Sequence, residues 1–349
     1  MPSIIDIYSR RTMQSLVDEI EVVRPKKTLS RRHFPVGSGI PSKWVDIDIY
    51  KGARRVAPFV HPLEKGKPVQ SLKYETRSFK PAYIKINKTI TAEDMDERVM
   101  GENIYNPSPA GVEYATKKMA REVMDCMQQK ERRIEIMARD ALFDGVVNVV
   151  GDGINATIDY QRDAAHDITL LGTSQWDDVD ADILGDLLDW KTLIFRNSGM
   201  VPRTVYMGTG ALKNALKNDE FKSFLHLLNL KLAEVVTDDS LLMRDGLTFY
   251  GQVHGMNIFT YDEWYIDPTD GVEKPMIPDN EVLVVGEGAE TQNELAYGLI
   301  KDFQSSLATS SDFIKSKFNF NPSWIEILYQ SSPLVLLKRP DVAVRAVVF

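Results

Sequence analysis

The chain has 349 residues, of which 43% are hydrophobic and 26% are charged; this ordinary globular composition excludes bulk disorder, a collagen and a plain coiled coil. Its mean hydropathy is −0.24 and no apolar run of about 18 residues occurs, so no membrane span is expected, and the charged residues Asp6, Arg10 and Arg11 exclude a secretory signal at the start. The net charge of −8 argues against a protein that grips nucleic acid through phosphates, and the single cysteine, Cys126, excludes an internal disulfide and cysteine-rich zinc sites.

Two different segments are expected before residue 44. Residues 1–23 place apolar side chains such as Tyr8, Met13 and Val17 at helical spacing and predict a short helix. Residues 24–43 are basic and are interrupted by three prolines and two glycines. Because prolines and glycines break regular structure, we expect this second segment to be an extended arm with little core of its own.

Residues 44–90 are expected to form a long ribbon of strands. Residues 44–50 and 82–90 alternate apolar and polar side chains with period two, as strands do. The basic stretch between them turns at residues 61–68, and such a ribbon extends about 50 Å at roughly 3.3 Å per residue. Because a two-stranded ribbon alone in water is only marginally stable, we expect another subunit to support it.

A long helix is predicted over residues 108–143. Ser108 is a fair N-cap, Pro109 takes the first helical position and Gly145 provides a stop. Apolar residues line one face and charged residues the other. At 1.5 Å per residue the helix is on the order of 50 Å long, which indicates a structural spine. Cys126 lies on this helix and is expected to be inert.

The remaining chain mixes helices and strands, which predicts an α+β fold. Helices are expected near 177–198 and over 211–218 and 218–232, and strands over 145–153, 204–208, 247–261 and 280–286. The tail, residues 324–349, is expected to form three strands separated at residues 331–333 and 338–341.

Charge is distributed unevenly along the chain. Residues 24–90 carry sixteen basic and four acidic residues, a net of +12, whereas residues 152–189 carry ten aspartates and one arginine, a net of −9. This pattern favours head-to-tail pairing between copies, although two solvated faces would also account for it. The candidate contact residues are basic residues of the arm and ribbon: Arg24, Lys26, Arg31, Arg32, Arg54, Arg55, Lys65, Lys67, Lys73 and Arg77.

The ribbon also interleaves aromatic and basic side chains, which is the pattern of a strip that binds single-stranded nucleic acid. The aromatic residues are Phe59, Tyr74, Phe79 and Tyr83. The negative charge of the whole chain and the balancing acidic segment favour a contact between subunits instead.

The sequence motifs that could mark a catalytic or ligand-binding site are weak. The turn Gly208–Gly210 follows a predicted strand and opens a helix, the setting of a phosphate site, but Lys213 stands where a dinucleotide motif needs its third glycine. A plain turn is therefore expected.

Four residues could ligate a metal ion if their segment were helical: Asp159, Asp163, His166 and Asp167. An exposed acidic loop is expected there instead. The five histidines are dispersed and form no recognisable triad. No catalytic, cofactor-binding or metal-binding residue is assigned, and no cofactor is expected.

The order of these parts resembles the major capsid proteins of tailed bacteriophages, and most closely the lambda-type major capsid protein E family. The resemblance spans nearly the whole chain, with residues 150–270 the least diagnostic. The stretches that carry it are Arg24-Pro25-Lys26 with Phe34-Pro35, FKPAYIKINKTITAEDMDER at 79–98, IPDNEVLVVG at 277–286 and WIEILYQSSPLVLLKRPDVAVRAVV at 324–348.

The resemblance implies the Hong Kong 97-like capsid fold, which is α+β. It implies an N-terminal arm (1–43), an E-loop with its flanking strands (44–90), a peripheral domain with the spine helix (91–150), a mainly axial domain (151–310) and closing strands (311–349). Lys65, Lys67 or Lys73 could sit where some relatives form a crosslink, but no motif fixes a pair, and we do not expect crosslinking.

By the same resemblance, the chain is a non-enzymatic subunit that assembles with itself as hexamers and pentamers into an icosahedral head. The implied partners are a separate scaffolding protein, a portal protein, a decoration protein and double-stranded DNA enclosed without sequence-specific binding. The protein would be made in the host bacterial cytoplasm and reside in the virion. Two alternatives stay open: an encapsulin-type compartment shell, and a cytosolic nucleotide-binding enzyme that uses Gly208–Gly210.

Overall fold

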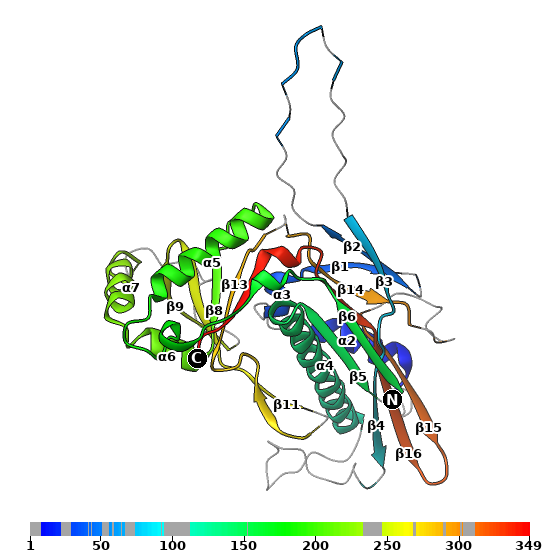
Figure 1. Cartoon of the computed structure of the whole chain (residues 1–349). Coiled ribbons are helices and arrows are strands. Elements are labelled where there is room, and N and C mark those ends of the chain that lie inside the picture. Colours follow the sequence, from blue (N-terminus) through cyan, green and yellow to red (C-terminus); the bar gives the residue numbers. More distant parts are fainter. Residues whose placement is uncertain are drawn as a thin grey trace.

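The computed structural model describes most of the chain as an α+β protein built around one long helix (Figure 1). None of the helices in the described part is both long and apolar enough to cross a membrane. The described residues are 8–21, 29–40, 42, 44–50, 56–57, 59–63, 65–66, 74–91, 93, 112–151, 153–232, 246–267, 270–288, 291–300, 302 and 311–349.

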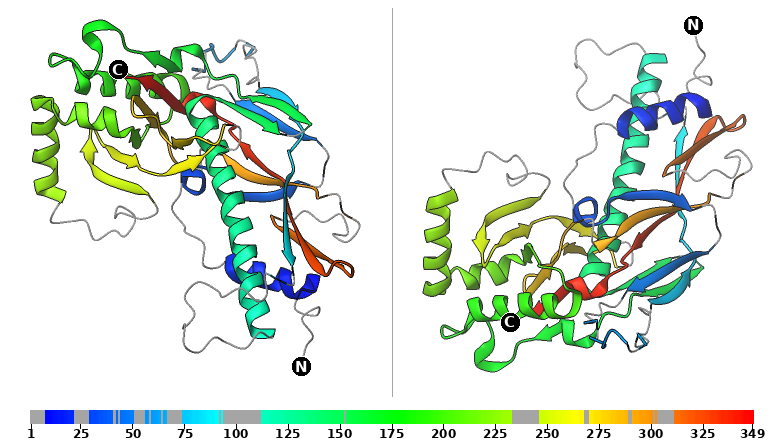
Figure 2. Two further views of the ribbon diagram at one scale, coloured as in Figure 1. Left: turned by 90° about the horizontal axis from the view of Figure 1, so that it is seen from below. Right: turned by 90° about the horizontal axis from the view of Figure 1, so that it is seen from above.

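The long helix α4 (Val112–Phe143) lies between the other parts of the molecule (Figures 1 and 2). Its buried side chains recur at helical spacing, among them Val123, Ile134 and Leu142, as the apolar stripe predicts. Gly145 follows the helix with a φ of 65°, a left-handed conformation that glycine adopts without strain. The predicted spine is thus confirmed from residue 112 onward, and its predicted start at residues 108–111 lies outside the described residues.

On one side of α4 a six-stranded sheet runs in the order β7-β18-β13-β8-β10-β9. Helices gather around it (Figure 1). The sheet and helices bury a cluster that includes the stacked Trp176 and Trp190. The elements are β7 (Asp167–Thr169), α5 (Ile183–Ser198), β8 (Thr204–Met207), α6 (Thr209–Ala215), α7 (Asp219–Leu232), β9 (Leu247–Val253), β10 (Met256–Tyr261), β13 (Glu281–Val285) and β18 (Ala343–Val347).

At the other end, α2 (Arg10–Glu21) crosses α4 near its N-terminal end (Figure 2). An antiparallel sheet in the order β15-β16-β4 lies beside the two helices, and all of them share one core cluster. Its strands are β4 (Ile84–Thr91), β15 (Phe313–Asn319) and β16 (Trp324–Ser331).

Between these two parts lies a three-stranded sheet in the order β1-β14-β17. The largest core cluster joins this sheet to α4 and to the ribbon. The remaining elements are α3 (Leu29–His33), β1 (Val36–Ile40), β2 (Val45–Tyr50), β3 (Tyr74–Phe79), β5 (Val146–Gly151), β6 (Ile154–Asp159), β11 (Trp264–Ile266), β12 (Glu273–Pro275), β14 (Glu294–Gly298), β17 (Pro333–Leu336) and three 3₁₀ turns, Ala164–His166, Gly172–Ser174 and Pro340–Val342.

Most predicted elements are confirmed, including the three strands of the tail and the break before each of the last two. The helix expected near 177–198 begins only at Ile183, because the Asp182 carboxylate caps it by accepting a hydrogen bond from the Gly185 amide at 2.8 Å.

The expectation of an extended, coreless arm is wrong for residues 29–40, which form α3 and β1. Leu29 and Phe34 are buried in the main core. The carboxylate of Glu135, on α4, accepts hydrogen bonds from the Leu29 and Ser30 amides at 2.6 and 3.0 Å. A side chain distant in sequence thus caps the first amides of this helix.

Candidate inter-subunit surfaces

The ribbon begins as a regular hairpin of β2 and β3. The prediction that residues 82–90 form its second strand is wrong, because they form β4, which pairs with β16 in another sheet. The two faces of β2 differ as the sequence predicts. Val45, Ile47 and Ile49 are buried in the main core. On the opposite face the Asp48 carboxylate accepts a hydrogen bond from the Thr76 hydroxyl at 2.6 Å. The strand pairing ends where Tyr50 lies directly opposite Tyr74. This base fixes the direction in which the loop leaves the molecule.

Beyond the hairpin, the loop carries apolar side chains into solvent. Phe59 is 100% exposed, Leu63 91% and Val56 90%, and Lys65 is also exposed. The described parts of the loop lie far from the rest of the chain (Figure 1). Fully exposed large apolar side chains at the end of a projection are typical of a surface that a partner covers.

The predicted contact residues fall into three groups. Lys65 is exposed on the loop, whereas Arg31, Arg32 and Arg77 make contacts within their own chain. The others lie outside the described residues: Arg24, Lys26, Arg54, Arg55, Lys67 and Lys73. Arg31 lies 3.3 Å from Glu131 of α4, so part of the basic charge of the arm is neutralised inside one subunit.

Arg32 anchors the arm to the six-stranded sheet. Its Nε lies 2.7 Å from Oε1 of Glu287, and its guanidinium stacks over the Phe259 ring at 4.5 Å from the centroid. Next to it, Nε2 of His33 and the Tyr206 hydroxyl are hydrogen bonded at 2.8 Å. Burial lowers the pKa of His33 to about 4, so the ring is neutral at pH 7 and the site has one cation and one carboxylate.

Part of the acidic segment 152–189 also serves its own chain. Asp159 lies 3.8 Å from Arg77 of the ribbon, Asp182 caps α5, and Asp186 accepts a hydrogen bond from the Trp176 indole at 2.9 Å. These aspartates complete local structure, so the net of −9 overstates the charge that this segment offers to a neighbour.

The Gly208–Gly210 turn is closed by the chain itself. A Cβ on Gly208 would meet the Pro278 carbonyl oxygen at 2.1 Å, and one on Gly210 would meet the Phe349 ring at 2.8 Å. The Ala211 amide donates to the Asp279 carbonyl at 2.7 Å. The amides that would hold a phosphate therefore have a protein carbonyl against them, and the glycines serve close packing.

The acidic residues near His166 perform structural tasks. Asp163 caps a 3₁₀ turn by accepting from the Ala165 amide, and Asp167 pairs with Arg162. The buried His166 is hydrogen bonded through Nδ1 to the Ala343 carbonyl at 2.9 Å and through Nε2 to Asn197. Among the described residues no cluster of three metal-ligating side chains occurs.

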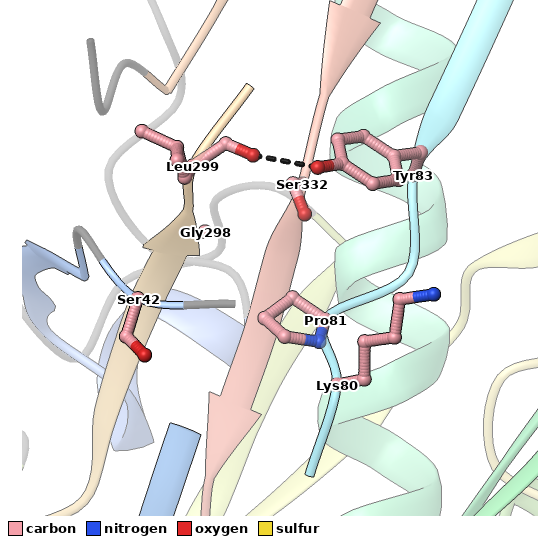
Figure 3. A pocket seen from close by; sticks show the side chains of 7 residues that line it. All are labelled: Ser42, Lys80, Pro81, Tyr83, Gly298, Leu299 and Ser332. Atoms are coloured by element: carbon pink, nitrogen blue, oxygen red, sulfur yellow. Dashed lines mark hydrogen bonds between the residues drawn. The ribbon is translucent and has the colours of Figure 1, made fainter. Parts of the chain in front are cut away.

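The chain crosses from the ribbon to β4 through a tight junction (Figure 3). The Tyr83 hydroxyl donates to the Leu299 carbonyl at 2.7 Å, and a Cβ on Gly298 would meet Pro81 at 2.9 Å and Ser332 at 3.0 Å. The cavity there has a volume of about 10 Å³, room for one water at most. The end of β3 that lies away from the loop is thus held firmly by β14 and the β16–β17 turn.

A second exposed apolar feature, which the sequence did not predict, is the hairpin of β11 and β12. Trp264 is 53% exposed, Ile266 68% and Val272 54%, at the edge of the molecule opposite the loop (Figure 1). A signal was present in the apolar run Trp264-Tyr265-Ile266, which acidic residues and a Pro-Thr-Asp-Gly turn follow.

Known proteins resemble this chain over most of its length. The major capsid protein of Enterobacteria phage phi80 is 23% identical over 305 residues, which cover 83% of this chain and 84% of that protein. Among solved structures, the prophage capsid protein of E. coli CFT073 superposes with a TM-score of 0.71 at 16% identity, covering 98% of this chain and 99% of that one. The capsid of Ralstonia phage GP4 gives 0.51 at 11% identity, covering 92% and 87%.

The two structural likenesses establish the fold, which is the Hong Kong 97-like capsid fold expected from the sequence. The family model described as phage major capsid protein E matches residues 12–348. A match of that extent leaves out only the two ends of the chain. The chain therefore belongs to the phage major capsid protein E family and is a structural protein of a phage capsid.

Proposed function

We propose that this protein assembles with itself as hexamers and pentamers into the icosahedral head shell that encloses the phage genome. The observation that carries the proposal is the projecting loop, whose apolar residues Phe59 and Leu63 are almost wholly exposed in the single chain. A loop that leaves one subunit to be covered by the next makes a heterologous contact, and such contacts close into rings when the rotation fits.

The proposal includes partners that a single chain does not contain. A separate scaffolding protein would guide assembly, a portal protein would occupy one vertex, and a decoration protein would bind the finished shell. The enclosed double-stranded DNA would meet a protein of net charge −8, which disfavours adhesion to phosphates. Synthesis would take place in the host bacterial cytoplasm.

Two alternatives are less well supported. The closed Gly208–Gly210 turn argues against a nucleotide-binding enzyme. An encapsulin-type compartment would share the fold, but the phi80 relative is a phage major capsid protein, which favours a virion shell. A neighbouring gene for a cargo enzyme with a targeting tail would support the compartment instead.

Negative-stain electron microscopy of the chain expressed with and without its candidate scaffolding protein tests the proposal. Shells, tubes or isolated capsomers are expected. A monodisperse monomer under every condition, including high protein concentration and varied salt, would contradict it.

Charge on the ribbon offers a second test, because basic residues of the loop are expected to meet an acidic surface of the next subunit. Reversal of Arg54 and Arg55 to glutamate should reduce the yield of shells. Normal shell yield from that variant would rule out an electrostatic role for these two residues.

A further inference from the structure

The β11–β12 hairpin has two faces of different character. Trp264 lies opposite Pro275 and Ile266 lies opposite Glu273 in the strand pairing, so these four side chains share one face. On the other face Tyr265 packs against the main core, and Lys274 lies 2.7 Å from Asp267. Within the described part of the chain, this second face is the one that binds the hairpin to its own subunit.

The free face is apolar with one carboxylate. Trp264 and Ile266 are more than half exposed, and Glu273 is exposed with no ion-pair partner among the described residues. A two-stranded sheet with a bare apolar face is marginally stable in water. This face therefore gains most from being covered by apolar side chains accompanied by a positive charge.

The loop of the ribbon has that chemistry. Its apolar residues Phe59 and Leu63 are exposed beside the exposed Lys65. Residues 54–67 contain four basic residues and one acidic residue, a net of +3, whereas residues 262–274 contain five acidic residues and one basic residue, a net of −4. The two surfaces match in both apolar character and charge.

The two features lie at opposite edges of the molecule, the loop at the top and β11 at the bottom of Figure 1. They are too far apart to meet within one chain, so a contact between them joins two copies head to tail. The acidic segment 152–189 is the alternative acceptor, and in it Asp159, Asp182 and Asp186 bond within their own subunit. In the hairpin Asp267 and Asp270 pair with Lys274, and Glu273 is the exposed carboxylate on the apolar face.

We propose that the free face of the β11–β12 hairpin receives the tip of the loop, residues 56–66, from a neighbouring copy. The proposal rests on the proposed function and names the acceptor surface for its loop. Phe59 and Leu63 cover Trp264 and Ile266, and Lys65 lies near Glu273 of the other chain. Each subunit gives one loop and receives one, which is the pattern of a closed ring.

Site-directed crosslinking on assembled full-length protein tests this. The chain with Leu63→Cys and Ile266→Cys, treated with a short bismaleimide, should give a denaturing-gel ladder that ends at five and six chains. The native Cys126 is buried, and burial raises the pKa of its thiol to about 11, so the unchanged chain provides a quiet background. Leu63→Cys with Val179→Cys is the matched control, because Val179 is 87% exposed but lies in the acidic segment.

Electron microscopy of the same samples distinguishes failure of the hairpin contact from failure of shell assembly. Shells that give no ladder from the Leu63 and Ile266 pair would overturn the hairpin as acceptor and leave the proposed function intact. Dimers formed by Ile266→Cys alone would overturn it as well, because hairpins would then meet each other. Absence of shells from the unchanged chain with its scaffolding protein would overturn the proposed function and this inference together.

Exchanging the charges of Lys65 and Glu273 provides a second test that does not depend on the folding of the cysteine variants. Lys65→Glu should lower the shell yield by at least about fivefold, and adding Glu273→Lys should restore most of it, since each contact is weak but repeats around every ring. The matched control adds Glu220→Lys in place of Glu273→Lys, because Glu220 is also exposed but lies on α7. Equal yields from the two double variants would overturn the proposal.

Discussion

At the scale of single residues, the most consequential buried charge is Lys130 on α4. Its ammonium is fully buried 2.7 Å from the Asp312 carboxylate, which the Tyr329 hydroxyl also contacts. Removing one partner of a buried ion pair costs about 3–5 kcal/mol, because the buried charge of the other partner loses its counter-charge. We expect Lys130→Met to lower the free energy of unfolding by that amount in urea denaturation. Lys222→Met breaks an exposed pair with Asp219 and should cost under about 1 kcal/mol; equal losses from the two variants would contradict this account.

His33 makes stability depend on pH in a defined window. Because burial lowers its pKa from 6.5 to about 4, the unfolded chain binds a proton between these values that the folded chain does not. Its contribution to stability is therefore complete above pH 6.5 and is lost as the pH falls towards 4, by about 3 kcal/mol in all. Denaturation at pH 7, 6, 5 and 4.5 should give a shallower pH dependence for His33→Gln than for the unchanged chain. Identical slopes would show that His33 titrates normally in the folded state.

At the scale of elements, the start of α6 depends on close approach. Gly208 has an ordinary φ of −63°, so alanine there would not strain the backbone, but its Cβ would meet the Pro278 carbonyl oxygen at 2.1 Å. We expect Gly208→Ala to destabilise the fold by about 1–3 kcal/mol or more through displacement of the turn before β13. Gly151→Ala, with nothing within 4 Å, is the control and should stay within about 0.5 kcal/mol. An unchanged free energy of unfolding in Gly208→Ala would show that the backbones at Gly208 and Pro278 separate easily.

Elements were predictable where their signals are local. The stripe on α4 and the period of two in β2 are contained in the chain segments themselves, and both are confirmed. Residues 29–40 were mispredicted because their partners are distant in sequence: Glu135 binds the first amides of α3, and β1 pairs with β14. The hairpin of β11 and β12 was not predicted because its first strand is a run of apolar residues. Such a run lacks the alternation of apolar and polar side chains by which a half-buried strand is recognised.

At the scale of the whole molecule, the family and fold were predictable from the order of the parts, whereas the charges that remain available for contacts with another subunit were not. Sequence charge pointed to the basic arm and ribbon, yet Arg31 and Arg32 are paired inside one subunit, and only the structure reveals which charges remain available. Of the predicted contact residues that are described, Lys65 remains exposed, beside the exposed Phe59 and Leu63 of the loop.

This arrangement predicts that folding and assembly can be separated. The register of β2 and β3 ends with Tyr50 directly opposite Tyr74, which is the geometry that a two-residue Asn-Gly turn closes. Replacing residues 51–73 with Asn-Gly should leave the thermal midpoint within a few degrees, because the described side chains of the loop are exposed and bury nothing against their own subunit. The same variant should form no shells, because the proposed rings would lose all of their loop contacts.

The measurement pairs differential scanning calorimetry with electron microscopy, and Gly66→Ala is the matched control within the loop, since a Cβ there meets nothing within 4 Å. Shells of normal size from the shortened chain would show that the loop is dispensable for assembly. A large fall in the thermal midpoint would instead show that the loop stabilises its own subunit. Loss of shells at an unchanged midpoint is the combination that follows from a loop whose apolar surface is buried only by a neighbour.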